Sequence, residues 1–247
     1  MLIVANWKSY VEDGEKAKKL TALSKKLSRD AHCTIVLAPS APFLGVLAAK
    51  NKSKVAFAAQ DVSATLGGAT TGEITARMYE SVGTSYAIIG HSERRAAGDT
   101  NEIIVKKLTH ALAHNLIPLL CVGERERDSE GRYLTFLREE ITSALTPLSP
   151  KERSKVVIAY EPLWAIGKEA SHAIDAHDLA EMILYIRKVL AELLPGNSAT
   201  RAHILYGGSV EPENIRSLAA TSSIDGFLVG RASVDEHTFA ALLKPFC

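Results

Sequence analysis

Eight short apolar runs alternate with longer amphipathic segments along the chain. The runs are rich in Val, Ile, Leu and Ala, which is typical of strands buried on both faces. Because the runs begin roughly 20 to 45 residues apart, each interval fits one strand-helix-strand unit. The predicted strands are residues 2–7, 34–38, 55–60, 86–90, 118–122, 156–161, 202–206 and 226–229.

The segments between the runs have the period of a helix with one buried face. Over residues 15–27 the apolar side chains fall on one side of a helix and the lysines on the other. The two sets are Ala17, Leu20, Leu23 and Leu27, and Lys18, Lys19, Lys25 and Lys26. One face of this helix is therefore expected to cover the strands.

Helix starts can also be predicted from local residues. Asp99 is followed three residues later by Glu102, which predicts a capping box for a helix that continues through Leu112. Asp175 predicts the start of a long helix that continues through Leu194.

Strict alternation of strands and helices, without a break in composition, predicts parallel strands. Eight such units close into a barrel more naturally than they divide into two domains. We therefore expect a single (β/α)8 barrel domain over residues 1–247. In this fold, active sites lie on the loops that follow the strands, at their C-terminal ends.

Composition narrows the possible partners. A net charge of +1 gives no general attraction to nucleic acid or to an anionic membrane surface, so any anion needs a local site. The three widely spaced cysteines argue against a disulfide framework or a zinc cluster and are typical of a reducing compartment. No targeting or membrane-spanning segment is predicted, so the expected location is cytoplasmic.

The sixth run ends in a carboxylate. Glu161 is followed by Pro162, which cannot continue a strand, and then by an apolar loop at residues 163–166. Two interpretations remain open for this stretch: a base beneath a covering loop, or a carboxylate paired with an arginine in front of a core Trp164.

Other polar residues follow the first and fourth runs. Asn6 and Lys8 come at the end of the first, and His91 follows the fourth. Taken singly, Lys8 is interpretable as a solvated charge and His91 as a loop histidine with satisfied hydrogen bonds. Together with Glu161, they predict a site with a cation, an imidazole and a base for one small ligand.

Glycine-rich segments follow the seventh and eighth runs. Gly207 and Gly208 precede Ser209, and Gly230 precedes Arg231. Backbone N–H groups in such loops bind anions, and barrels often hold a phosphate at this position. The alternative is that these glycines only form tight turns.

Five motifs in chain order closely resemble those of the triosephosphate isomerase family. They are Asn6-Trp7-Lys8, residues 90–95 (Gly-His-Ser-Glu-Arg-Arg), residues 159–167 (Ala-Tyr-Glu-Pro-Leu-Trp-Ala-Ile-Gly), residues 206–210 (Tyr-Gly-Gly-Ser-Val) and residues 225–230 (Asp-Gly-Phe-Leu-Val-Gly). The resemblance implies a (β/α)8 barrel, usually dimeric. It also implies interconversion of dihydroxyacetone phosphate and glyceraldehyde 3-phosphate, without a metal or an organic cofactor.

The resemblance assigns roles to matching positions. Glu161 would be the base, His91 would polarise the carbonyl oxygens, and Lys8 with Asn6 would stabilise the developing negative charge. The phosphate would be held by Ser209 and by the N–H groups of Gly167, Gly208, Gly230 and Arg231.

The resemblance also implies supporting features. The loop at residues 163–166 would be the start of a lid, Glu93 the charged partner of Lys8, and Cys121 the residue behind the base. The loop from Ser63 to Glu73 would insert into a second subunit and form a homodimer.

Three segments depart from the common family pattern. Ser9 and Tyr10 stand where Met-Asn is common, residues 168–171 (Lys-Glu-Ala-Ser) rewrite the second half of the lid, and Arg231 replaces a frequent glycine. Two other functions are considered: a barrel aldolase with Lys8 as Schiff-base nucleophile, and a catalytically impaired barrel that binds a phosphate ligand.

Overall fold

The predicted apolar runs form the strands of a closed parallel barrel. The computed structural model describes residues 1–49, 51–166, 174–221 and 223–247. The strands follow one another around the ring in chain order, and β8 pairs with β1 to close it. They are β1 (Leu2–Asn6), β2 (Thr34–Ala38), β3 (Ala56–Ala59), β4 (Tyr86–Ile89), β5 (Ile117–Val122), β6 (Val157–Tyr160), β7 (Ile204–Tyr206) and β8 (Gly226–Val229). The predicted (β/α)8 fold is therefore confirmed.

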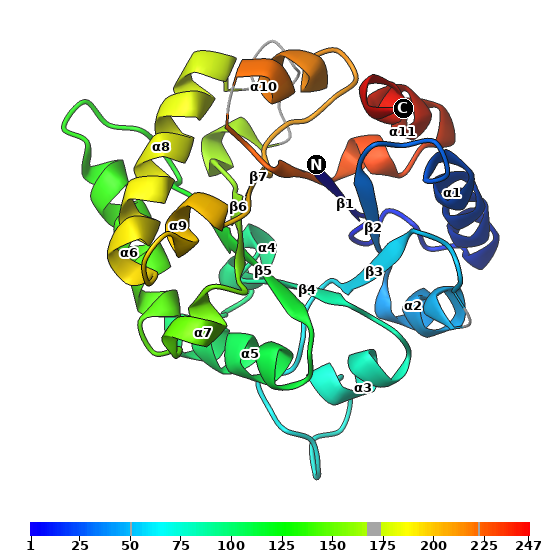
Figure 1. Cartoon of the computed structure of the whole chain (residues 1–247). Coiled ribbons are helices and arrows are strands. Elements are labelled where there is room, and N and C mark those ends of the chain that lie inside the picture. The colour runs from blue at the N-terminus through cyan, green and yellow to red at the C-terminus, as the bar shows by residue number, and fades with distance from the viewer. Residues whose placement is uncertain (50, 167–173, 222) are drawn as a thin grey trace.

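The helices surround the barrel (Figure 1). They are α1 (Gly14–Leu27), α2 (Ala41–Ala48), α3 (Ala76–Ser81), α4 (Ser92–Ala96), α5 (Asn101–Ala113), α6 (Arg132–Leu145), α7 (Pro150–Arg153), α8 (Ala176–Leu193), α9 (Ser198–Arg201), α10 (Ile215–Thr221) and α11 (Glu236–Leu243). Short 3₁₀ turns are η1 (Leu163–Ala165), η3 (Arg231–Ser233) and η4 (Lys244–Phe246). No helix in the described part of the chain is long and apolar enough to span a membrane.

Two apolar clusters form the core, one on each face of the ring of strands. On β1, Ile3 and Ala5 belong to the larger cluster with the helices, whereas Val4 belongs to the smaller cluster with residues of the other strands. Both faces of the strands are buried, which explains why the strands read as continuous apolar runs. The interior of the barrel is thus filled by side chains, and a ligand can bind only at its ends.

Helix starts agree with the local signals, with one exception. Asp175 caps α8 as predicted, and its side chain accepts a hydrogen bond from the Asp178 N–H. The predicted cap at Asp99 is wrong, because Thr100 caps α5 and accepts from the Ile103 N–H. The Asp99 carboxylate instead bonds to Lys107, 2.6 Å away.

Candidate active site

The loop after β1 is fixed by hydrogen bonds from its neighbours. Lys8 has a positive φ of 46°, and its N–H donates to Asn6 Oδ1 over 3.1 Å. Its carbonyl oxygen accepts from Ser40 Oγ and from Gln60 Nε2. These bonds hold a backbone conformation that costs free energy at a non-glycine residue. The ammonium group is thereby aimed at Glu93, whose Oε1 lies 2.7 Å from Lys8 Nζ.

His91 is buried at the start of α4 with its tautomer set by hydrogen bonding. Its Nδ1 accepts from the Glu93 N–H over 3.2 Å, so the proton of a neutral ring is on Nε2. Nε2 lies 3.3 Å from Glu161 Oε1. A neutral ring with this tautomer donates from Nε2.

Glu161 is a buried carboxylate directly after β6, with only 3% of its surface exposed. Its N–H donates to the Val122 carbonyl over 2.8 Å, and its Oε2 accepts from the Ser92 N–H over 3.4 Å. Two glycines leave room for it. A Cβ on Gly123 would lie 1.9 Å from the Glu161 carbonyl oxygen, and one on Gly207 would lie 2.8 Å from Glu161 Cγ. The glycines after β5 and β7 therefore allow Glu161 to enter the barrel mouth.

Cys121 is buried on β5 beside Glu161. Burial raises the pKa of its thiol well above the ordinary value, and the charge of Glu161 raises it further. The thiol is therefore a neutral packing group behind the carboxylate, as the resemblance implied.

The loops after β7 and β8 form the opposite wall. Ser209 is buried, and its hydroxyl donates to the Ala165 carbonyl over 2.9 Å. Gly230 has φ −91° and ψ −108° and leads into η3 at Arg231. Among described residues other than glycine, only Lys8 and Asn115 have a positive φ. Arg231 therefore replaces glycine without left-handed strain, and its N–H remains at the start of a turn.

The first residues of the apolar loop after β6, residues 163–166, are hydrogen-bonded to Glu124, whose side chain is buried. Glu124 Oε1 accepts from the Tyr160 hydroxyl over 2.9 Å and from Trp164 Nε1 over 2.8 Å. The guanidinium of Arg127 lies over the Trp164 ring, 4.8 Å from its centroid. The Leu163 N–H also donates to the Glu124 carbonyl. The first part of the loop is thus tied to the loop after β5.

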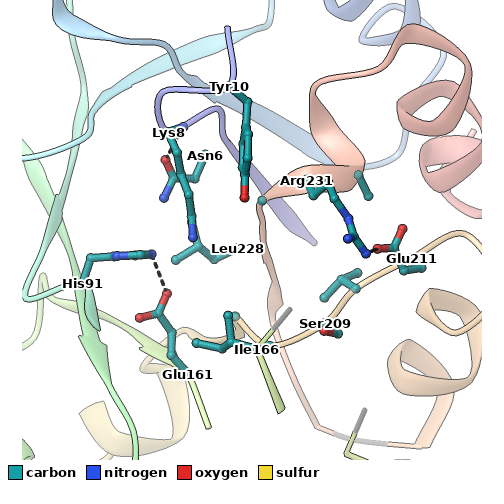
Figure 2. Close-up of a pocket in the computed structure, with 15 residues that line it drawn as sticks. Asn6, Lys8, Tyr10, His91, Glu161, Ile166, Ser209, Glu211, Leu228 and Arg231 are labelled. Carbon is teal, nitrogen blue, oxygen red and sulfur yellow. Dashed lines mark hydrogen bonds and ion pairs between the residues drawn. The ribbon is translucent and has the colours of Figure 1, made fainter. Parts of the chain in front are cut away.

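These walls enclose a pocket with a cavity volume of about 100 Å³. Figure 2 shows Lys8, His91 and Glu161 pointing toward one another on one side, with Ser209 and Arg231 on the other. The pocket is lined by Asn6, Lys8, Tyr10, His91, Glu161, Ile166, Gly207, Gly208, Ser209, Val210, Glu211, Leu228, Gly230, Arg231 and Ala232. A carboxylate, an imidazole and a lysine side chain therefore share one cavity with two glycine-rich loops.

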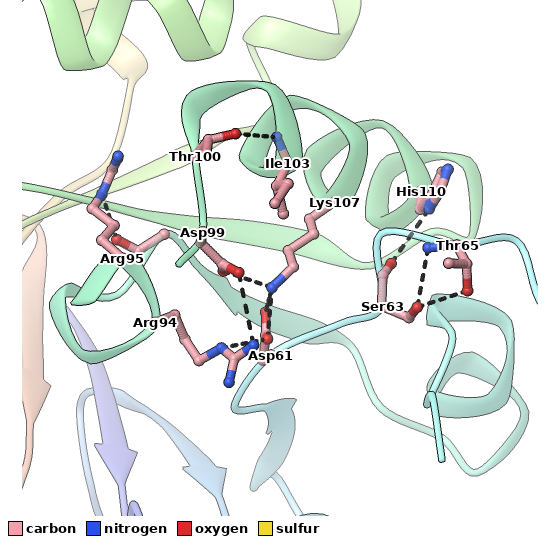
Figure 3. Close-up of polar contacts among 11 residues, drawn as sticks. Asp61, Ser63, Thr65, Arg94, Arg95, Asp99, Thr100, Ile103, Lys107 and His110 are labelled. Carbon is pink, nitrogen blue, oxygen red and sulfur yellow. Dashed lines mark hydrogen bonds and ion pairs between the residues drawn. The ribbon is translucent and has the colours of Figure 1, made fainter. Parts of the chain in front are cut away.

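A buried ion cluster supports the loop that carries His91 (Figure 3). Lys107 is 3% exposed, and its Nζ lies 2.7 Å from Asp61 Oδ2 and 2.6 Å from Asp99 Oδ2. Arg94 Nε, on α4, lies 2.8 Å from the same Asp61 oxygen. The cluster thereby joins α4 to α5 and to the loop after β3.

Comparison with known proteins identifies the family. The family model described as triosephosphate isomerase matches residues 1–246. The chain belongs to the triosephosphate isomerase family. Its relatives include the triosephosphate isomerases of Moorella thermoacetica, 39% identical over 98% of this chain and 97% of the relative, and of Clostridium perfringens, 40% identical over 98% of both. That of Roseiflexus castenholzii is 38% identical over 98% of this chain and 96% of the relative.

Eight of the nine residues that the family motifs assigned to catalysis and phosphate binding line the pocket. The ninth, Gly167, lies outside the described residues, as do the rewritten lid positions 168–171. Glu211 and Leu228 were missed as pocket residues from the sequence, and Tyr10 was noted only as a departure from the common family pattern. The position of Glu211, directly after residues 206–210, was the available signal.

Proposed function

We propose that this chain interconverts dihydroxyacetone phosphate and D-glyceraldehyde 3-phosphate by proton transfer through an enediolate, as in glycolysis and gluconeogenesis. One distance carries the proposal most directly: His91 Nε2 lies 3.3 Å from Glu161 Oε1 in a pocket that also holds Lys8. Isomerisation needs a base for a carbon-bound proton and a donor for the adjacent oxygen, and these two groups supply both.

The proposed reaction assigns one role to each group. The Glu161 carboxylate removes a proton from one carbon of the bound triose and returns it to the neighbouring carbon. The His91 Nε2–H donates to the substrate oxygens, and the Lys8 ammonium with the Asn6 amide stabilises the negative charge that develops on them. Glu161 now occupies the acceptor position of His91, so its side chain has to turn toward the substrate carbon when a carbonyl oxygen replaces it.

The phosphate is proposed to bind at the opposite wall. The proposed partners are the N–H groups of Gly208, Gly230 and Arg231 and the Ser209 hydroxyl, which donates to the Ala165 carbonyl in this structure. The N–H of Gly167 would complete the set. Ile166 and Leu228 supply apolar surface to the same pocket. Exclusion of water by such surface strengthens the hydrogen bonds that act on the enediolate.

A coupled isomerase assay on purified protein tests this function. Glu161→Asp shortens the base by one methylene and should lower kcat about 10²-fold or more while KM changes little. Glu139→Asp is the matched control, because Glu139 is exposed on α6 and does not line the pocket. An unchanged kcat in Glu161→Asp would remove Glu161 from the role of base.

The aldolase alternative is less well supported. Lys8 Nζ makes a 2.7 Å contact with Glu93, and this contact would have to break before the nitrogen could attack a substrate carbonyl. Borohydride reduction in the presence of substrate, followed by peptide mass analysis, separates the two functions, because an isomerase gives no adduct on Lys8. Phosphoglycolate binding without isomerisation would instead favour the impaired binding barrel.

We propose that the chain is a homodimer formed through the loop of residues 63–73. Figure 1 shows this loop projecting away from the ring of helices between β3 and α3. Its side chain Leu66 is 78% exposed, and Ile74 and Met78 beside the loop are also exposed. Exposed apolar side chains on a projecting loop are typical of an interface. Sedimentation of Leu66→Asp should show a weaker dimer, whereas Leu184→Asp on α8 should not.

A cytoplasmic location is proposed as well. It is supported by the free state of Cys33, Cys121 and Cys247, as expected in a reducing compartment. Fractionation of the source cells, with the isomerase activity assayed in each fraction, tests it.

A further inference from the structure

One charged pair lies between the loops that follow β7 and β8, where the phosphate is proposed to bind. This pair has no role in the reaction proposed above. Arg231 Nη2 lies 3.4 Å from Glu211 Oε1, and both residues line the pocket (Figure 2). Glu211 follows β7, whereas Arg231 begins the turn η3 after β8. The roles carried over from the family motifs use only the backbone N–H of Arg231 and do not involve Glu211.

Glu211 places a negative charge in a pocket proposed to receive a phosphate dianion. Its backbone is fixed, because its N–H donates to Asn214 Oδ1 over 2.9 Å and its carbonyl oxygen accepts from the Ile215 N–H. Asn214 Nδ2 also donates to the Ser209 carbonyl, so this turn is joined to the phosphate wall. The carboxylate therefore stays near the pocket and repels a second anion unless a cation neutralises it.

Arg231 is suited to exchange one anion for another. Its side chain is 64% exposed, and its contact with Glu211 is long and exposed to water, so the pair is weak. A guanidinium can bind a carboxylate or a phosphate with the same planar set of N–H donors. Arg231 also lines the same pocket as Gly208, Ser209 and Gly230, the other residues proposed to bind the phosphate.

We propose that the Arg231 side chain is a substrate-positioning group that passes from Glu211 to the substrate phosphate. Glu211 and the phosphate then compete for one guanidinium, so Glu211 limits how tightly the phosphate is held and assists product release. The inference rests on the proposed function, because it takes the phosphate end of the triose as the ligand. It adds a side-chain cation to a site otherwise made of backbone N–H groups and Ser209.

Calorimetry with phosphoglycolate tests whether the Arg231 guanidinium binds the phosphate. The key comparison is made in Glu211→Gln, which lacks the carboxylate that competes for this guanidinium. Glu211→Gln should bind phosphoglycolate several-fold more tightly than the unchanged chain, because the guanidinium is released for the phosphate. Adding Arg231→Gln to Glu211→Gln should then weaken binding about 10-fold, because a charge-assisted contact is lost. If Arg231 only neutralises Glu211, the Glu211→Gln variant and the double variant will bind equally, which would overturn the proposal.

Two further variants complete the experiment. Arg231→Lys should recover part of the binding that Arg231→Gln loses, because a cation is restored without the planar fork. Arg201→Gln removes the same charge from exposed Arg201 in α9, just before β7 and at the opposite end of the barrel, and should leave binding unchanged. Equal loss in Arg201→Gln and Arg231→Gln would assign the effect to net charge and contradict the proposal.

Parallel kinetics distinguish failure of this inference from failure of the proposed function. Arg231→Gln should raise KM more than it lowers kcat, because the phosphate is bound in both the ground state and the transition state. If the chain without substitutions does not isomerise trioses, but its phosphoglycolate binding is weakened by Arg231→Gln, only the proposed function is refuted. An active chain with Arg231-independent binding would refute only the role of Arg231.

Discussion

Gly207 and Glu161 approach so closely that a Cβ on Gly207 would lie 2.8 Å from Glu161 Cγ. Gly207→Ala should therefore displace the carboxylate from its place opposite His91. A misplacement of about 1 Å costs about 10²-fold in rate, so kcat should fall by about this factor. Steady-state kinetics measure the effect.

Gly14→Ala is the control for this change, because a Cβ there would meet Phe43 at an ordinary 3.7 Å. Its kcat should match that of the unchanged chain. Retention of full kcat by Gly207→Ala would mean that the carboxylate does not depend on this contact for its position.

The cation Lys107 should be essential for stability. It is enclosed by Asp61 and Asp99 (Figure 3), and Lys107→Met would leave these carboxylates without it. Removal of one partner from a buried ion pair typically costs about 3–5 kcal/mol of the free energy of unfolding. Urea denaturation followed by circular dichroism measures the loss.

Lys106→Met provides the comparison, because Lys106 is exposed on the same helix. It should change the free energy of unfolding by less than about 0.5 kcal/mol. Adding Asp61→Asn and Asp99→Asn to Lys107→Met should restore part of the lost stability, because the two carboxylates that had paired with Lys107 are then replaced by neutral amides. A triple variant less stable than Lys107→Met would argue against the electrostatic explanation.

The pair of Lys8 and Glu93 predicts a dependence of stability on pH. Burial raises the pKa of Glu93, but the hydrogen bond and charge of Lys8 outweigh it, and the net pKa lies below the ordinary 4.5. A lowered pKa stabilises the fold above the pKa of the unfolded chain, and this contribution is lost as pH falls through the folded value. The difference in urea midpoint between the unchanged chain and Glu93→Gln should therefore shrink below pH 4.5.

A second glutamine variant calibrates this experiment. Glu139→Gln changes an exposed glutamate on α6 outside the pocket, and it should shift the urea midpoint little at either pH. A Glu93→Gln difference that grows on acidification would contradict the sign of the pKa shift.

The three cysteines should differ in reactivity toward Ellman's reagent. Cys247 is exposed and should react first, whereas burial and the charge of Cys247 raise the pKa of Cys33 to about 11 and slow its reaction. Cys121 is buried beside Glu161 and should react only when the chain unfolds. Loss of the fast phase in Cys121→Ser, rather than in Cys247→Ser, would contradict this order.

The sequence predicted the barrel well because the same physical pattern marks every strand. Each predicted run overlaps an observed strand, and the bounds of β2 and β8 agree in full, whereas β5 begins one residue before its predicted run. Parallel strands buried on both faces leave continuous apolar runs, whereas most of the long helices have charged residues on one face. The apolar segment Ala41–Ala48, which forms α2, is an exception. The strand-end residues Lys8, His91 and Glu161 were predictable for the same reason, since closure of the ring brings strand ends together.

Side-chain pairings between distant residues could not be predicted in this way. Asp99 has the local pattern of a helix cap, yet tertiary contacts with Lys107 and Arg94 bind its carboxylate, and Thr100 caps the helix. Glu211 was not predicted as a site residue, because it pairs with Arg231, which lies on a different loop. A local sequence pattern does not show which residues from distant segments will form ion pairs or hydrogen bonds in the folded chain.

The closure of β8 onto β1 has a consequence for biosynthesis. A ribosome makes the strand that leads to Lys8 first and the strand that leads to Gly230 last, yet both residues line one pocket. During translation the nascent chain can fold its early strand-helix units, but it has no complete pocket until β8 emerges and pairs with β1. Ligand-dependent stabilisation is therefore unavailable to the growing polypeptide and begins only after the ring has closed.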